Sequence, residues 1–288
     1  MLEHFQLSTF NFQFSFSTFN FQLSTFNFQL STFNFQLSTF NFQLSTFNFQ
    51  PKSMLLEVCC GHYESARLAI ESGADRIELC AALPIGGLTP SSDTIVAVKK
   101  LSNVPIMVLI RPREGNFIYS KAEKKIILSE IKSTINAGAD GIVIGALDTQ
   151  NGIDFPFIQK ITSEHPTTSI TFHRAFDFVI DPFLAMEQLI DLGIERILTS
   201  GQKPTALAGK DLIQKLIKKA GDRIIIMPGS GINHHNIKEI VKLFPKEIHL
   251  SAKKTLKSKI NQAFDTSLML FDLEEFSLCK KVLATTVI

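Results

Sequence analysis

The sequence lacks several features that would place it in a functional class at once. Its 288 residues include no tryptophan and two tyrosines, and no segment reaches the roughly 18 consecutive apolar residues that span a bilayer. The N-terminus has neither the basic start nor the apolar run of a signal peptide. We therefore expect a cytoplasmic protein with no membrane partner.

An excess of charge of one sign is also missing. Lys and Arg number 29 against 27 Asp and Glu, and the two signs alternate without a basic block. A surface that binds a phosphate backbone needs a basic excess on one face, so we expect no nucleic-acid partner.

Cysteine is scarce and follows no framework. The four residues Cys59, Cys60, Cys80 and Cys279 include no CxxC pair and no Cys/His spacing of a structural zinc site. A chain of this length needs no disulfide to stabilise its core, so we expect reduced thiols.

A repeat of seven residues, Phe-Gln-Leu-Ser-Thr-Phe-Asn, dominates the start of the chain. It runs from Phe5 to Gln50, and the first 50 residues hold 15 of the 26 phenylalanines and no charge after His4. Aromatic, uncharged segments that contain Asn and Gln tend to self-associate. Two interpretations stay open: a self-associating tail, or a repeat expansion or over-extended start upstream of Met54. In the second case residues 1–53 are disordered or not part of the native protein, and the domain is residues 54–288.

Residues 54–288 alternate between short apolar runs and longer amphipathic segments, and the alternation repeats eight times. The apolar runs are Leu55–Cys60, Arg76–Cys80, Pro105–Arg111, Gly141–Leu147, Ser169–His173, Arg196–Ser200, Arg223–Met227 and Glu247–Ala252. The helical patterns include Glu64–Ser72, Ser120–Ala137, Pro182–Leu192, Asn233–Phe244 and, as the last helix within residues 253–288, Phe271–Leu283. Strand and helix in regular alternation predict a parallel sheet covered by helices.

Glycines mark where the helical patterns end. Gly73-Ala74-Asp75, Gly138-Ala139-Asp140 and the variant Gly193-Ile194-Glu195 each stand between a helical pattern and the next apolar run. Eight units predict an α/β fold of the TIM (β/α)8 barrel type, which typically has about 250 residues. An open doubly wound sheet is the weaker alternative, because no G-x-G-x-x-G follows the first run.

Alternation within each run separates side chains that face the helices from those that face the barrel interior. Apolar residues such as Ile77 and Leu79 identify the helix-facing parity. The interior parity holds ionisable residues, namely Glu57, Arg76, Glu78, Arg111, His173 and His249. Buried charges must be paired, so each residue alone fits an internal ion-pair network. As a set near the strand ends where barrel enzymes keep their sites, they favour a functional site.

A glycine-containing loop, Pro228–Asn233, follows the seventh apolar run. Gly229, Ser230 and Gly231 would let backbone N–H groups approach an anion, with Asn233 capping the next helix. Loops after the seventh and eighth strands are the usual phosphate site of such barrels. The alternative is a tight turn without a ligand.

Cys59 and Cys80 share the interior parity on the first two runs, and we expect them at a similar height. Two thiolates there would give a soft ion such as Cu(I) a two-sulfur site, with Cys60 or His62 as further candidate ligands. The alternative is that both thiols act as small buried hydrophobic groups.

Seven ordered motifs resemble those of the CutC family of copper homeostasis proteins. They are Leu56–Cys59, Gly73–Cys80, Gly86–Ser91, Ile110–Arg113, Thr171–Asp177, Leu198–Gly201 and Met227–Gly229. The resemblance implies a cytosolic TIM barrel that binds Cu(I) and forms a homo-oligomer. It also implies copper ligands at Cys59 and Cys80 and a polar pocket of Glu57, Arg76, Glu78, Arg111 and His173, with Arg174 adjacent. The sequence departs from the family at Cys60, His62 and Ser230, and its repeat has no counterpart there.

Two functions remain. One is a Cu(I)-binding homeostasis protein that uses Cys59 and Cys80. The other is an enzyme acting on a small anionic or phosphorylated metabolite, because two thiolates do not account for so many ionisable groups. Its candidate residues are Glu57 or Glu78 as general acid or base, His173 as proton shuttle, Arg111 and Arg113 as anion clamps, and the Pro228–Gly231 loop as phosphate seat.

Overall fold

The computed structural model of the protein describes residues 54–256 and 267–285. The heptad repeat, and with it every prediction for residues 1–53, lies outside these ranges.

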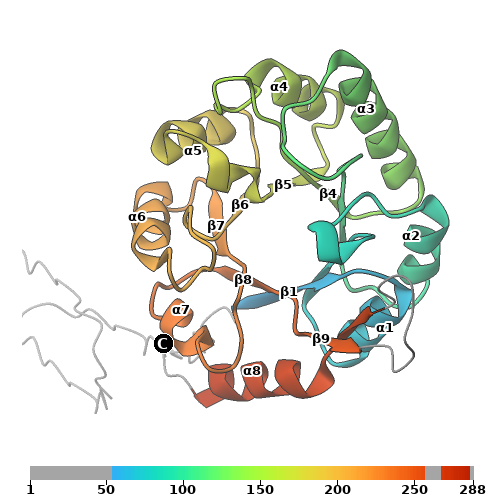
Figure 1. The fold of residues 1–288 in the computed structure, drawn as a ribbon, viewed down its shortest axis with the longest axis vertical. Helices are drawn as coiled ribbons and strands as arrows, with labels where there is room; N and C mark the ends of the chain where they lie inside the picture. Colours follow the sequence, from blue (N-terminus) through green and yellow to red (C-terminus); the bar gives the residue numbers. More distant parts are fainter. Residues whose placement is uncertain (1–53, 257–266, 286–288) are drawn as a thin grey trace, which may run out of the picture. The chain divides into compact units, whose positions relative to one another are not determined.

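Eight parallel strands form the centre of the described part (Figure 1). Their bounds are β1 Leu55–Cys60, β2 Arg76–Leu79, β3 Ile106–Leu109, β4 Gly141–Ile144, β5 Ser169–Phe172, β6 Arg196–Thr199, β7 Ile225–Pro228 and β8 Glu247–Leu250. The hydrogen-bonded order is β7-β6-β5-β4-β3-β2-β1-β8, and β7 also lies beside β8. The sheet therefore curls into a ring, which confirms the predicted TIM barrel.

Helices surround this ring (Figure 1). They are α1 Tyr63–Glu71, α2 Ser92–Lys99, α3 Lys121–Asn136, α4 Phe155–Glu164, α5 Pro182–Asp191, α6 Lys210–Ala220, α7 Ile237–Val241 and α8 Leu273–Thr285, with short 3-10 turns η1 Leu83–Ile85 and η2 Arg174–Phe178. Ser120 begins α3 with a reciprocal capping box to Glu123, which satisfies two N-terminal N–H groups. Gly73 and Gly138 adopt the left-handed φ that the helix ends predicted, at +79° and +94°.

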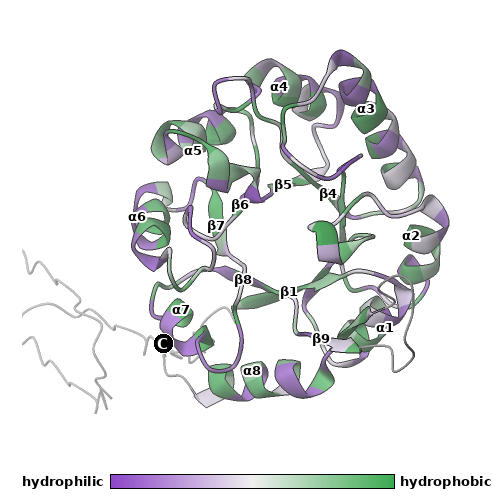
Figure 2. Cartoon of the chain, in the orientation of Figure 1, coloured by the Kyte–Doolittle hydropathy of each residue, from purple (hydrophilic) through white to green (hydrophobic). Residues whose placement is uncertain are grey.

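The main core lies between the strands and the helices. Ile77, Ile142 and Ile248 on the helix-facing side of the strands pack there against Ile131, Leu189 and other helix residues. The helices accordingly turn their apolar sides inward and their polar sides outward (Figure 2). No helix in the described ranges is long and apolar enough to cross a membrane.

The structure corrects two predicted elements. The helix expected over Asn233–Phe244 covers only Ile237–Val241, and the residue at its N-cap position is Asn236. Asn233 instead accepts a hydrogen bond from the His235 N–H within a turn, because Asn side chains compete with helical hydrogen bonds. The last helix does not occupy the C-terminal region alone: strands β9 Lys253–Leu256 and β10 Leu268–Phe271 pair antiparallel before α8 begins.

Candidate functional site

Charged residues fill the part of the barrel interior near the N-terminal ends of the strands. Arg76 Nε donates to Glu57 Oε2 at 2.5 Å, Arg76 also pairs with Glu247, and Arg196 Nε lies 3.2 Å from Glu247 Oε2. All four side chains are buried. Burial alone would raise the pKa of Glu57, but the hydrogen bond from His249 and the charge of Arg76 hold it at about 2. The network keeps Glu57 ionised.

This network places Glu57 and Arg76 away from the open cavity. Neither lines the cavity of about 450 Å³ at the barrel mouth, whereas Cys59, Glu78, Cys80, Arg111, His173 and His249 do. Glu57 reaches the cavity only through His249, whose Nδ1 lies 2.8 Å from Glu57 Oε1. Glu57 therefore positions a cavity residue, while Glu78 is the carboxylate that faces the cavity.

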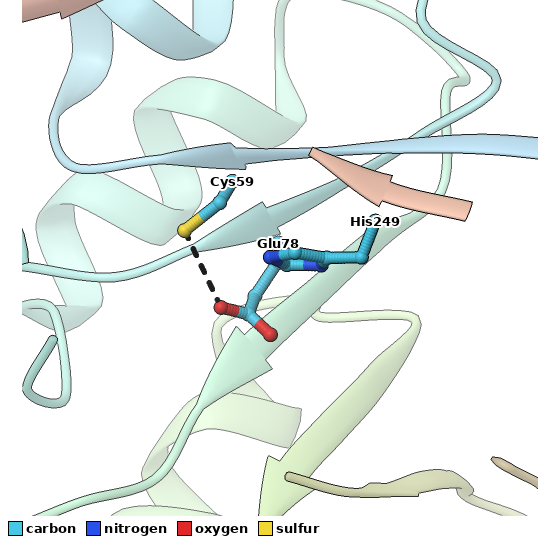
Figure 3. Close-up of side chains that lie close together, drawn as sticks. All are labelled: Cys59, Glu78 and His249. Carbon is cyan, nitrogen blue, oxygen red and sulfur yellow. Dashed lines mark hydrogen bonds between the residues drawn. The ribbon is translucent and has the colours of Figure 1, made fainter. Parts of the chain in front are cut away.

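Three cavity side chains converge from neighbouring strands (Figure 3). Cys59 lies on β1, Glu78 on β2 and His249 on β8, and the register pairs Cys59 with Glu78 and Glu57 with His249. Sulfur, carboxylate oxygen and imidazole nitrogen all lie within 4.8 Å of one another, and the Cys59 thiol donates to Glu78 Oε1 at 3.5 Å. All three residues are buried, so solvent screens these contacts less than it would at the surface.

The three side chains influence one another's protonation. The neighbouring Cys80 thiol and burial raise the pKa of the Cys59 thiol well above its usual value. Burial raises the pKa of Glu78. Burial disfavours the charged form of His249, but Glu78, Cys59 and Glu57 together raise its pKa well above its usual value. The group thus favours a neutral Cys59 thiol beside the protonated form of His249, which Glu57 and Glu78 stabilise.

His173 lies on the opposite wall of the cavity. Its Nδ1 accepts a hydrogen bond from the Ala175 N–H at 3.0 Å, which leaves the proton on Nε2. Burial and the charge of Arg111 lower its pKa to about 3. Gly145 makes room for the ring, because a Cβ there would lie 2.3 Å from His173 Cε1. His173 is therefore a neutral side chain with one N–H to donate.

Arg111 holds two loops together. Its Nη1 donates to the carbonyls of Ile85 and Gly87, and its Nη2 donates to Gly115 O. Its guanidinium also lies over the ring of Phe117, 5.2 Å from the centroid. Most of its donors are used within the protein, so its contribution to the cavity is mainly positive charge.

The expected anion loop reaches the cavity in part. Ser230 and Gly231 line it, but Gly229 packs closely on Leu198 and His249, and the Ser230 hydroxyl donates to Pro204 O. The short α7 begins only at Ile237, so the helix N-terminus predicted to follow this loop at Asn233 is absent from it.

Three further candidate residues lie elsewhere. Cys60 points into the core between strands and helices, and His62 caps α1 while contacting Met269 O. Arg113 pairs with Glu123 at the surface side of α3. None of the three lines the cavity.

Sequence reasoning missed Glu247 and Arg196. The signal was available, because Glu247 shares the parity that placed His249 in the interior, and Arg196 stands at the start of an apolar run as Arg76 does. Both residues complete the charge balance beneath the cavity.

Comparison with known proteins decides the family. The model of the CutC family matches residues 54–254. The chain belongs to the CutC family. CutC family proteins from Pasteurella multocida and Bacteroides fragilis are 45% and 44% identical over 201 and 209 residues, covering 69% and 72% of this chain and 82% and 83% of theirs.

One solved structure agrees with the CutC assignment, and a second shares only the fold. CutC from Streptococcus agalactiae, described as a candidate copper homeostasis protein, superposes with a TM-score of 0.66 at 30% identity, over 69% of this chain and 98% of that one. Phosphoribosyl anthranilate isomerase from Thermotoga maritima reaches a TM-score of 0.51 at 14% identity, over 81% of this chain and 100% of that one. The second likeness shows the barrel fold alone.

Proposed function

We propose that this CutC family member is a cytoplasmic copper homeostasis protein that binds Cu(I) through Cys59 and Cys80. The observation that carries the proposal is that both thiols are buried in one small interior cluster and line the same cavity. Met107, whose thioether is also soft, belongs to that cluster. Sulfur ligands select Cu(I) over harder ions. The relative from Streptococcus agalactiae, described as a candidate copper homeostasis protein, supports the same assignment.

Copper binding is tested with cysteine variants. We expect the reduced protein to take one equivalent of Cu(I) from a chromophoric Cu(I) chelator under anaerobic conditions, and Cys59→Ser/Cys80→Ser to take none. Cys279→Ser is the matched control, because Cys279 is equally buried but lies on α8 away from the cavity. Unchanged Cu(I) stoichiometry in the double variant would refute the proposal.

A second candidate, an enzyme or binding protein for a small anionic metabolite, is favoured by one observation. Within the described residues, Glu78 Oε2 and His173 Nε2 are buried without a hydrogen-bond partner. Both residues line the same cavity, beside the cations Arg111 and Arg174. Buried polar atoms are rarely left unsatisfied, so a ligand that accepts from His173 Nε2 and donates to Glu78 Oε2 would satisfy both. With its low pKa, His173 would serve as a hydrogen-bond donor to an anionic oxygen.

This second function predicts ligand binding at His173. Calorimetric titration with glycerol phosphate should show binding that His173→Asn weakens at least about tenfold, the loss of one hydrogen bond to a charged group. His165→Asn is the control, because His165 follows α4 and so lies at the opposite end of the barrel. Equal affinity of all three proteins, or no binding at all, would count against this function.

A further inference from the structure

We infer that Cys59, Glu78 and His249 form a three-ligand site for a divalent cation of borderline softness, of which Zn²⁺ is the type, open toward the cavity. This inference goes beyond the Cu(I) proposal, with which it shares one ligand, Cys59. The remaining ligands differ, because Cu(I) would draw on Cys80 and the divalent ion on Glu78 and His249. The two metals can therefore be separated by experiment.

The types of ligand atom in this group suit zinc. One thiolate, one carboxylate oxygen and one imidazole nitrogen are ligand types that zinc accepts together in tetrahedral sites. Here the three atoms lie within 4.8 Å of one another, on three adjacent strands that hold them rigidly. Cys80 is not part of this mutually close group. A hard carboxylate and a borderline imidazole suit a divalent ion better than they suit Cu(I).

The surroundings of His249 orient its ring as in metal-binding histidines. Its Nδ1 faces Glu57 Oε1 at 2.8 Å, so the other ring nitrogen, Nε2, is left to face Cys59 and Glu78 (Figure 3). Metal-binding histidines regularly donate their second N–H to a carboxylate, which fixes the ring and increases its basicity. Glu57 is itself held by Arg76. The arrangement of carboxylate, histidine and metal position is thus already present.

The unpaired oxygen of Glu78 and the adjoining cavity also favour a bound ion. Glu78 Oε2 is buried and has no hydrogen-bond partner among the described residues, although its other oxygen accepts from the Cys59 thiol. Coordination would satisfy it. All three ligands line the cavity of about 450 Å³, so a water molecule or an anionic ligand has space for a fourth coordination position. Three protein ligands with one open position are the pattern of catalytic rather than structural zinc.

Binding changes the protonation of the group in a defined way. The ion replaces the proton on Cys59 Sγ and the proton on His249 Nε2, and both protons pass to solvent. Oxidation states do not change. Glu57 keeps its hydrogen bond to His249 Nδ1, so the ion-pair network of Glu57, Arg76 and Glu247 is preserved.

The test uses the full 288-residue chain, reduced and stripped of metal. Zn²⁺ is titrated in competition with a chromophoric chelator, and Co²⁺ is used as a spectroscopic substitute. We expect one equivalent of each ion, with a sulfur-to-cobalt charge-transfer band. His249→Gln and Glu78→Gln should each weaken Zn²⁺ binding by more than the 10–100-fold typical of outer-shell changes, and Glu57→Gln by about 10–100-fold.

Two control variants make the outcome specific. Cys80→Ser should keep its Zn²⁺ affinity within about threefold while losing Cu(I) binding. Glu130→Gln is the control for the loss of a carboxylate, because Glu130 is partly buried and contacts Thr89 instead of the site. Circular dichroism establishes that each variant is folded. Retained Zn²⁺ binding in both His249→Gln and Glu78→Gln, or loss in Cys80→Ser alone, would overturn the inference. Failure of Cu(I) binding with intact Zn²⁺ binding would instead refute only the proposed copper function.

Discussion

Replacing Arg76 by methionine is expected to lower the free energy of unfolding by about 3–5 kcal/mol. Arg76 stands between Glu57 and Glu247, and the side chains of this trio are at most 9% exposed. Methionine fills a similar volume but leaves Glu57 with His249 as its remaining charged partner and Glu247 with Arg196. The loss therefore comes from two buried carboxylates that each keep one cationic partner instead of two. Urea unfolding followed by circular dichroism measures it.

The same substitution at the surface provides the control. Arg223 pairs with Glu187, and both side chains are at least 36% exposed. Arg223→Met should change the unfolding free energy by less than about 1 kcal/mol, because solvent screens such pairs. Similar losses in the two variants would mean that burial of the interior network does not determine its contribution to stability.

The fold was accessible from the sequence because its signals are local. Alternation of apolar runs and amphipathic segments gave the eight strands, and glycines such as Gly73 and Gly138 gave the helix ends. Two elements were not accessible. Asn233 has the chemistry of a helix cap, but three residues of turn follow it. The sequence of Lys253–Leu256 is too polar to indicate a strand, and all four residues are exposed in the structure. Only pairing with β10 makes it one.

The candidate site shows a different limit. Side-chain parity depends on a period of two, so it correctly placed Glu57, Glu78 and His249 in the interior. Parity says nothing of height along the barrel axis, which depends on the stagger between strands. The observed register sets Cys59 opposite Glu78, so the group of Cys59, Glu78 and His249 could not be derived by counting. Nor could parity tell that Glu57 lies beneath the cavity.

Acid should destabilise the protein through His173. Burial and Arg111 lower its pKa to about 3, from an unfolded value of about 6.5. Below pH 6.5 the unfolded chain binds a proton that the folded protein does not, so stability falls as the pH decreases toward 3. One proton corresponds to about 1.4 kcal/mol per pH unit, or about 2–3 kcal/mol between pH 6.5 and 4.5. Above pH 6.5 the contribution is constant.

The effect is isolated by comparing wild type with His173→Asn. Other groups titrate alike in both proteins, so the difference between their unfolding free energies should shrink by about 2–3 kcal/mol from pH 6.5 to 4.5. His165→Asn, at a partly exposed position, is the control for the loss of a histidine outside the cavity. The His173 ring resonances should also stay constant between pH 5 and 8 by NMR. A midpoint near 6.5 would show that the ring is protonated in the folded protein, and the neutral N–H donor assigned to the cavity wall would then be wrong.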